Sequence, residues 1–124
     1  MIDIEIDLPM PPSVNAVWRS VGGKVIKAKA YRKWIEKADA ICLAQPGWRN
    51  KTIRGRYSVL LILNETMMRI NSDGDNRLKV PLDYAKRLGL IVDDSIKYAR
   101  EWHIKLGDDS NAPAGARLIL RSAQ

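Results

Sequence analysis

Two aspartates separated by a single glycine, Asp73-Gly74-Asp75, are the residues in this sequence best suited to binding a hard cation. In an extended backbone both carboxylates point to the same side, because successive side chains alternate. Gly74 leaves the space between them open to a substrate. Mg²⁺ prefers oxygen ligands and retains some of its waters, so carboxylates together with a phosphate oxygen suit it well. The pattern therefore indicates a Mg²⁺ site, with Mn²⁺ as an alternative metal.

A lysine and a second pair of aspartates follow this motif. Lys79 comes four residues after Asp75, which places the two on the same face of a helix. A lysine at that position can neutralise the charge on a phosphate during its displacement. Asp94, with Asp93 as the alternative, would approach from the far end of the helix and complete the group of metal ligands.

A purely structural interpretation accounts for the same residues. Asp75 can cap the helix that follows it, since aspartate is a favoured N-cap residue. Asp73 and Gly74 can form an ordinary turn, and Asp93-Asp94 another. Two aspartates at this spacing are common, so the motif by itself favours the structural interpretation.

The first half of the chain predicts a strand, a helix and a second strand. Residues 1–8 alternate between apolar and acidic side chains, which is typical of a half-buried strand, and Pro9 to Pro12 end it. Gly22-Gly23 indicates a tight turn. Residues 28–44 have apolar side chains at helical spacing, with Pro46-Gly47 as the stop. Residues 56–64 are apolar on both faces, as in a central strand of a sheet.

The second half predicts the helix that would position the acidic motif. This helix is expected over residues 75–88, with Gly89 as its C-terminal stop. Pro81 does not suit its interior, so the helix either bends there or begins later. Strands are expected over 96–106 and 116–121. We therefore predict an α/β (mixed α+β) fold, in which residues 1–124 form a single domain with a mixed sheet flanked by helices.

The basic residues are unevenly distributed along the chain. Residues 19–56 contain eleven Lys and Arg against two acidic residues, a net charge of +9, while the rest of the chain sums to −2. This imbalance fits a polyanion held near an acidic site, and it equally fits a solvated basic face. The residues predicted to contact such a polyanion are Lys24, Lys27, Lys29, Arg32, Lys33, Arg54, Arg56 and Arg69.

Composition excludes several other classes of protein. With 46% hydrophobic and 28% charged residues, the chain is expected to form a globular core. Cys42 is the only cysteine, so neither an internal disulfide nor a cysteine-based zinc site is expected. No signal peptide and no membrane-spanning stretch is expected from the sequence. We therefore expect a soluble protein of a reducing compartment such as the cytoplasm.

Two separated motifs resemble those of RusA-like Holliday junction resolvases. Ser72-Asp73-Gly74-Asp75-Asn76-Arg77-Leu78-Lys79, followed by Val92-Asp93-Asp94, resembles that family's R-D-x-D-N-x-x-K and D-D signature. The start of the chain, residues 8–15 (LPMPPSVN), is similar to the family's L-P-x-P-P-S-x-N. The likeness extends from the first predicted strand to the last. The family's basic run before the paired aspartates is thin here, which shifts the expected DNA contact to residues 19–56.

The resemblance implies an activity and assigns residues to it. It places the metal ligands at Asp73, Asp75 and Asp94 and the catalytic lysine at Lys79, and the motifs suggest that Asn15 and Asn76 hold the carboxylates. It implies a homodimer, often encoded by a phage or prophage, that nicks two strands of a four-way DNA junction with Mg²⁺ in recombination and repair. A non-catalytic basic DNA-binding module and a Mg²⁺-dependent nuclease without junction preference stay open as alternatives. A nucleotide-directed phosphoryl-transfer enzyme is disfavoured, because no Gly-rich phosphate loop is present.

Overall fold

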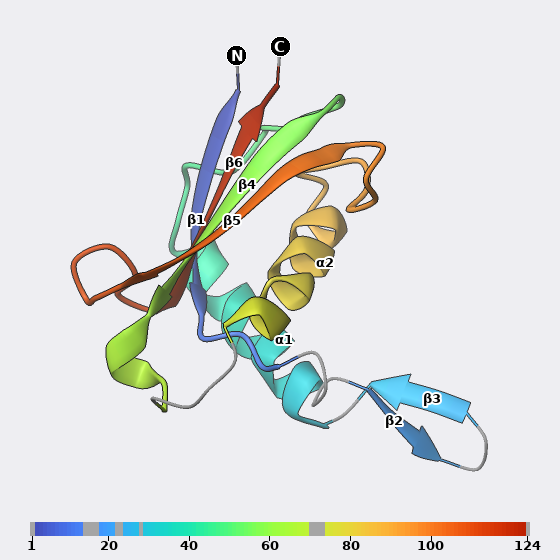
Figure 1. Ribbon diagram of the computed structural model, residues 1–124, viewed down its shortest axis with the longest axis vertical. Helices are drawn as coiled ribbons and strands as arrows, with labels where there is room; N and C mark the ends of the chain where they lie inside the picture. The colour runs from blue at the N-terminus through green and yellow to red at the C-terminus, as the bar shows by residue number, and fades with distance from the viewer. Residues whose placement is uncertain (1, 14–17, 22–23, 28, 70–73, 124) are drawn as a thin grey trace.

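A four-stranded mixed sheet forms the centre of the molecule (Figure 1). The structure is a computed structural model that describes residues 2–13, 18–21, 24–27, 29–69 and 74–123. The strands lie side by side in the order β1, β6, β4, β5, with the bounds Asp3–Pro9, Gly115–Ser122, Tyr57–Asn64 and Ala99–Gly107. β6 is antiparallel to both of its neighbours, and β4 is parallel to β5. The predicted mixed α+β fold in one small domain is confirmed.

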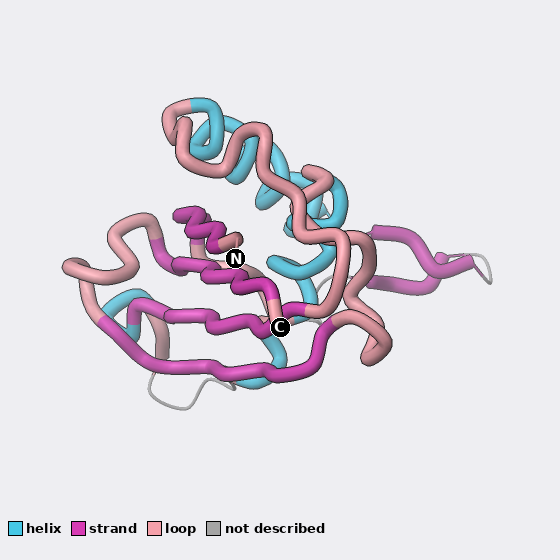
Figure 2. The backbone as a smooth tube through the Cα atoms, turned by 90° about the horizontal axis from the view of Figure 1, so that it is seen from above, coloured by secondary structure: helices cyan, strands magenta, loops and turns pink. Residues whose placement is uncertain are grey.

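Two helices pack on one face of this sheet (Figure 2). α1 (Lys29–Leu43) precedes β4, and α2 (Lys79–Arg87) connects β4 to β5. The alternating residues of β1 explain which face is covered, because Ile4, Ile6 and Leu8 are buried in the same core as the apolar sides of both helices. The helices also touch each other, since the rings of Trp34 and Tyr84 meet edge to face with centroids 5.3 Å apart. No helix among the described residues is long and apolar enough to cross a membrane.

The helix that follows the acidic motif begins later than its first predicted residue. A 3₁₀ turn, η3 (Asp75–Arg77), comes first, and α2 starts at Lys79. Pro81 is consequently the third residue of α2, where a backbone N–H has no partner within the helix, so the proline causes no break. Gly89 has a φ of 77°, and it ends the helix as predicted.

Other boundaries also differ from the sequence-based prediction. β5 begins at Ala99 rather than at residue 96, because residues 96–98 form a turn that brings the chain back to the sheet. A two-stranded antiparallel hairpin, β2 (Trp18–Val21) with β3 (Lys24–Lys27), was not predicted. The two strands lie on either side of Gly22-Gly23, where a tight turn was predicted, but these two residues lie outside the described part of the chain. A second 3₁₀ turn, η2 (Glu65–Met67), follows β4.

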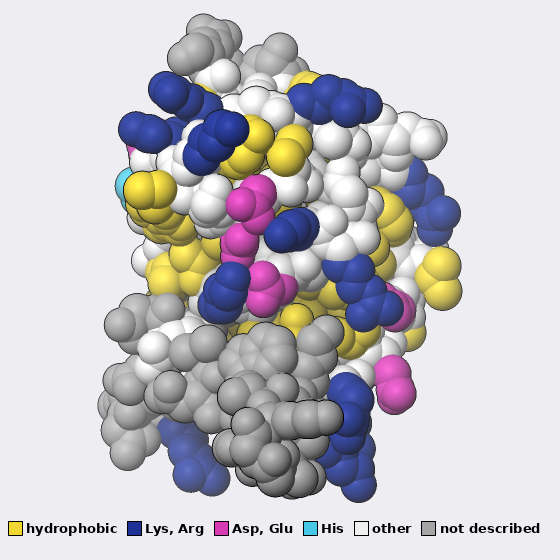
Figure 3. Space-filling model, turned by 90° about the vertical axis from the view of Figure 1, so that its right-hand side faces the viewer, with side chains coloured by type: hydrophobic (Ala, Val, Ile, Leu, Met, Phe, Trp, Pro, Cys, Tyr) yellow, Lys and Arg dark blue, Asp and Glu magenta, His cyan; other side chains and the backbone are white. Residues whose placement is uncertain are grey.

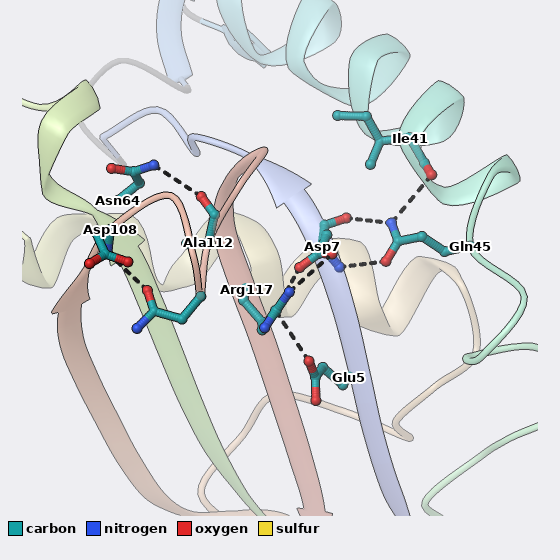
Figure 4. Close-up of polar contacts among 9 residues, drawn as sticks. Glu5, Asp7, Ile41, Gln45, Asn64, Asp108, Ala112 and Arg117 are labelled. Atoms are coloured by element: carbon teal, nitrogen blue, oxygen red, sulfur yellow. Dashed lines mark hydrogen bonds and ion pairs between the residues drawn. The ribbon is translucent and has the colours of Figure 1, made fainter.

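Side chains tie β1 to its surroundings on two sides (Figure 4). On the open face of the sheet, the Arg117 guanidinium lies 2.7 Å from Asp7 Oδ1 and 3.2 Å from Glu5 Oε1. At the outer edge of β1, the Gln45 side-chain amide accepts a hydrogen bond from the Asp7 N–H and donates one to the Asp7 C=O, each 2.7 Å long. Gln45 comes just after α1, so this contact connects the helix to the sheet edge.

We expect Gln45→Ala to lower the free energy of unfolding by about 1–3 kcal/mol, because the partly buried Asp7 N–H and C=O both lose their partner. Lys51→Ala is the matched control. Lys51 Nζ also donates to a β1 carbonyl, that of Asp3, but from an exposed position, so a change within about 0.5 kcal/mol is expected. Urea denaturation of both variants measures the difference, and equal effects would contradict the role given to Gln45.

Candidate functional site

The predicted site residues fall into a described and an undescribed group. Asp73 and Asn15 lie outside the described residues. Asp75 is placed by its backbone as the first residue of η3, and Asn76 is half-buried within the same turn. Lys79 and Asp94 are described in full. The geometry of the site is therefore built from Lys79 and Asp94 outward.

Lys79 is the first residue of α2, one turn after Asp75 in the chain. Its ammonium contacts the Asp94 carboxylate and lies 3.0 Å from Asp83 Oδ1. Asp94 arrives from the segment that leads from α2 back to β5, fifteen residues further along the chain. Half of the Lys79 side chain stays exposed, against 16% of Asp94. The Lys79 ammonium can therefore reach a bound molecule, while most of the Asp94 side chain is shielded from solvent.

The two neighbouring aspartates, Asp93 and Asp94, have different partners. Asp93 Oδ1 lies 2.9 Å from Lys86 Nζ, near the end of α2, and the Asp93 carbonyl accepts a 2.9 Å hydrogen bond from the Tyr57 hydroxyl. Asp94, in contrast, turns to Lys79. The chain bends in this segment between α2 and β5, and the two neighbouring carboxylates face different lysines of α2. Of the two, Asp94 is the one placed beside the predicted catalytic lysine.

The electrostatics of this cluster follow from these contacts. Partial burial lowers the pKa of Lys79, but its hydrogen bonds to Asp94 and Asp83 outweigh burial, so the pKa is raised overall. Lys86, together with Ser95, holds the pKa of the Asp93 carboxyl well below its usual range. Burial and the negative charges of Asp94 and Asp93 raise the pKa of Tyr57. Lys79 and Asp93 are therefore charged, and Tyr57 is a neutral hydrogen-bond donor, at neutral pH.

An open hollow of about 620 Å³ adjoins Lys79, between α1 and α2. Lys86 and Arg87 also line it, together with Asp83 and apolar parts of both helices. On this side of the molecule, acidic side chains form a short central column with lysine and arginine side chains around it (Figure 3). The arrangement can accept a phosphate next to the carboxylates, because the cations offset the repulsion between the two.

The proline segment after β1 contacts the turn that begins at Asp75. Arg77 Nη1 donates a 2.7 Å hydrogen bond to the Pro11 carbonyl, and Trp34 Nε1 donates a 3.0 Å bond to the Pro9 carbonyl. The Nε atom of Arg77 is buried and has no partner among the described residues. The Arg77 bond joins the two motifs, which are far apart in the sequence, and the Trp34 bond joins the proline segment to α1.

The predicted DNA-binding residues do not form one patch. Lys29, Arg32 and Lys33 are exposed in the first part of α1, next to the β2–β3 hairpin. Arg54 and Arg56 are exposed in the loop before β4, where the Arg56 carbonyl accepts from Ala123 beside the C-terminus. In Figure 1 the hairpin and the two termini lie at opposite ends of the molecule.

The remaining predicted DNA contacts lie elsewhere. Arg69 is exposed after η2, and the side chains of Lys24 and Lys27 lie outside the described residues. The +9 segment is thus divided between the two ends of the fold.

The donor chemistry at Asp94 fits Mg²⁺, since carboxylate oxygens are its preferred protein ligands. Among the described side chains no group of three potential ligands occurs, and two of the three predicted ligands, Asp73 and Asp75, are not among those side chains. Asp94 with the two motif aspartates would hold the ion, and Lys79 would lie at its side.

Sequence reasoning missed three participants in this cluster. Asp83, four residues after Lys79, has the spacing of a helical ion pair, and this signal was available. Lys86 and Tyr57 carry no such signal, because their partners come from the return segment after α2. No protein-family model matches this chain, and a search of curated proteins finds no match to it.

We expect Asp94→Asn to lower the pKa of Lys79, because a bond that favours the charged amine is weakened while the burial that opposes it remains. The matched variant Asp93→Asn should instead lower the pKa of Lys86 and leave Lys79 unchanged. Nuclear magnetic resonance titration of the lysine side chains measures both values. A Lys79 that responds equally to the two substitutions would contradict the division of partners.

Proposed function

We propose that this protein is a Mg²⁺-dependent endodeoxyribonuclease of the RusA-like type, which nicks four-way DNA junctions in recombination and repair. The observation that carries the proposal is the pairing of Lys79 with Asp94 directly after the turn that begins at Asp75. A cation and a carboxylate fifteen residues apart in the chain thus meet next to the acidic motif, and this pairing supports the proposed phosphodiester hydrolysis.

Each residue has a distinct part in the proposed reaction. Asp94, with Asp73 and Asp75, would hold the ion. Bound Mg²⁺ supplies charge stabilisation at the scissile phosphate and a more acidic attacking water. Lys79, being half exposed, offsets negative charge on the scissile phosphate, and Asp83 holds the ammonium in position when DNA is absent.

The surrounding cations favour a DNA strand over a small substrate. Lys86 and Arg87 continue the positive charge along α2, away from Lys79 and beside the hollow. Phosphates adjacent to the scissile one can bind there, which positions the strand without reading its sequence. A homodimer would carry two such sites, and the two-fold symmetry of a four-way junction would then receive paired cuts.

A cleavage assay that compares a four-way junction with linear duplex of the same sequence distinguishes this function from its alternatives. We expect Mg²⁺-dependent nicking of the junction, with Mn²⁺ as a substitute. Binding without nicking would indicate a non-catalytic DNA-binding module. Equal cutting of both substrates would indicate a nuclease without junction preference.

The three carboxylates should be essential for cutting but not for binding. We expect Asp73→Asn, Asp75→Asn and Asp94→Asn each to abolish nicking while DNA affinity is kept or increased, because every change removes a metal ligand and a charge that repels phosphate. Asp93→Asn is the matched control and should retain most activity. Near-normal cutting by any of the three variants would remove that residue from the ligand set, and a more severe loss at Asp93 than at Asp94 would move the ligand by one position.

Lys79→Ala should lower single-turnover cleavage about 10²–10³-fold while folding, Mg²⁺ binding and junction binding persist, because a charge facing the transition state is lost. Lys79→Arg should restore part of the rate at most, since a planar guanidinium does not reproduce a compact ammonium. Lys86→Ala, a cation on the same helix but paired with Asp93, is the control and should affect binding more than the rate. Cleavage by Lys79→Ala within a few-fold of the parent would show that Lys79 has only a structural role.

A further inference from the structure

The two edges of the main sheet differ in whether side chains bond to their outward backbone groups. At the β1 edge, side chains bond to the outward backbone groups of three residues: Lys51 bonds to the Asp3 carbonyl, Gln45 to Asp7, and Trp34 to the Pro9 carbonyl. β5 forms the other edge, and no described strand pairs with its outer side. None of the side-chain hydrogen bonds among the described residues reaches the backbone of residues 100–106 there. An open edge of this kind is a template for pairing with another strand.

The side chains of β5 are as exposed as its edge. Residues 100–106 are exposed on both faces of the sheet. Trp102, Ile104 and Leu106 lie on the face that the helices cover elsewhere, opposite the buried residues of β4, yet they remain 44%, 36% and 54% exposed. Natural edge strands usually carry prolines, bulges or charges on the inward face, and from Trp102 to Leu106 this face of β5 has none of these, although the ladder with β4 skips Arg100 at the start of the strand. The strand therefore has the composition of a paired strand without a partner among the described residues.

We propose that β5 pairs antiparallel with β5 of a second copy of this chain, so that two sheets join into one of eight strands around a two-fold axis at His103. An antiparallel pair brings together side chains of the same face, so the axis must pass through a residue rather than between two. His103 is the middle of the nine-residue strand, and this register pairs the strand along its whole length.

Charge selects the same register. With the axis at His103, Glu101 faces Lys105 of the second copy, and the reverse pair forms on the other side of the axis. Opposite charges directly across an antiparallel pair are favourable. An axis at Trp102 would place Glu101 opposite His103, and an axis at Ile104 would place Lys105 opposite His103. Of these three registers, only the His103 register joins the carboxylate to the ammonium.

The apolar residues agree with this assignment. In the His103 register Trp102 faces Ile104 of the second copy, and this apolar pair occurs twice, once on each side of the axis. The contact closes on itself, because each strand presents the same surface to the other, so the product is a dimer and not a filament. The interface is argued independently of the proposed function. It rests on that function in one respect only, which is that a dimer would bring two nuclease sites together.

Charge reversal tests the interface by sedimentation equilibrium. The parent chain should be a dimer that dissociates reversibly. Glu101→Lys and Lys105→Glu each place like charges across the axis at two positions and should weaken dimerisation by about tenfold or more. The double variant E101K/K105E should restore the dimer. An equimolar mixture of the two single variants should form a heterodimer, because every reversed charge then meets its opposite. Arg100→Glu is the matched control, since it makes the same charge change as Lys105→Glu at a residue that the ladder between β4 and β5 skips.

A cross-link provides a second measurement that does not depend on charge. In the proposed register the two copies of residue 103 face each other with Cα atoms about 4.5–5.5 Å apart, which a disulfide can span. His103→Cys should therefore form a covalent dimer under mild oxidation, and Lys105→Cys should not. The single native cysteine, Cys42, is buried, so it does not compete for the cross-link.

The outcomes separate this inference from the proposed nuclease activity. The interface would be overturned if the parent chain were monomeric up to high micromolar concentrations. It would also be overturned if the single charge-reversal variants dimerised as the parent does, whether or not DNA is cut. A dimer that responds to reversal and rescue as described would support the interface even if the chain cuts no DNA.

Discussion

The parallel pairing of β4 with β5 is the constraint on which the candidate site depends. Parallel neighbours cannot be joined by a tight turn, so the chain after β4 must travel back along the sheet before β5 can begin. The connection uses η3 and α2 on one face, followed by a return segment through Asp93 and Asp94. Lys79 and Asp94 meet because one opens the helix of this crossover and the other lies in its return.

The helix of this crossover, α2, has one apolar side and one charged side, so it can hold charged residues at the surface while it packs on the core. Beneath them, the apolar side of α2 is buried against the core, and Tyr84 meets Trp34 of α1 there. The charged side of α2 is left free to pair with Asp83, Asp93 and Asp94. The cations of α2 thus lie along the helix next to the carboxylates with which they pair. This is a suitable arrangement for a phosphate backbone, whose charge would otherwise be repelled by the acidic residues.

The two sheet edges have different consequences for assembly. β1 is closed by Gln45, Lys51 and Trp34, all supplied by α1 and the loop after it. β5 extends past the cover that the helices give to the rest of the sheet, which leaves Trp102 and Leu106 exposed. The side-chain contacts along β1 and the open backbone of β5 are therefore the reason for proposing that a second copy binds at β5, where the charges of the strand are self-complementary.

The sequence by itself determined the element types and most of their order, because period-two and period-3.6 patterns report local geometry directly. The strand over 3–9, the helix over 29–43 and the strand over 57–64 were predictable for this reason. The β2–β3 hairpin was not predicted, since four-residue strands hold too few side chains to display a pattern. The later start of α2 was foreseen only as one way to accommodate Pro81, and the start of β5 was placed three residues too early.

The acidic motif and the lysine beside it were singled out through the resemblance, because their spacing alone favoured a structural interpretation, and the partners of these residues were not predicted. Only the tertiary structure decided that Asp94 rather than Asp93 turns to Lys79, that Lys86 and Tyr57 belong to the same cluster, and that the basic segment divides between two ends of the molecule. It also decided which strand lies at the open edge of the sheet. These are contacts between residues far apart in the chain, set by how the crossover and the sheet order bring elements together, and local periodicity carries no information about that.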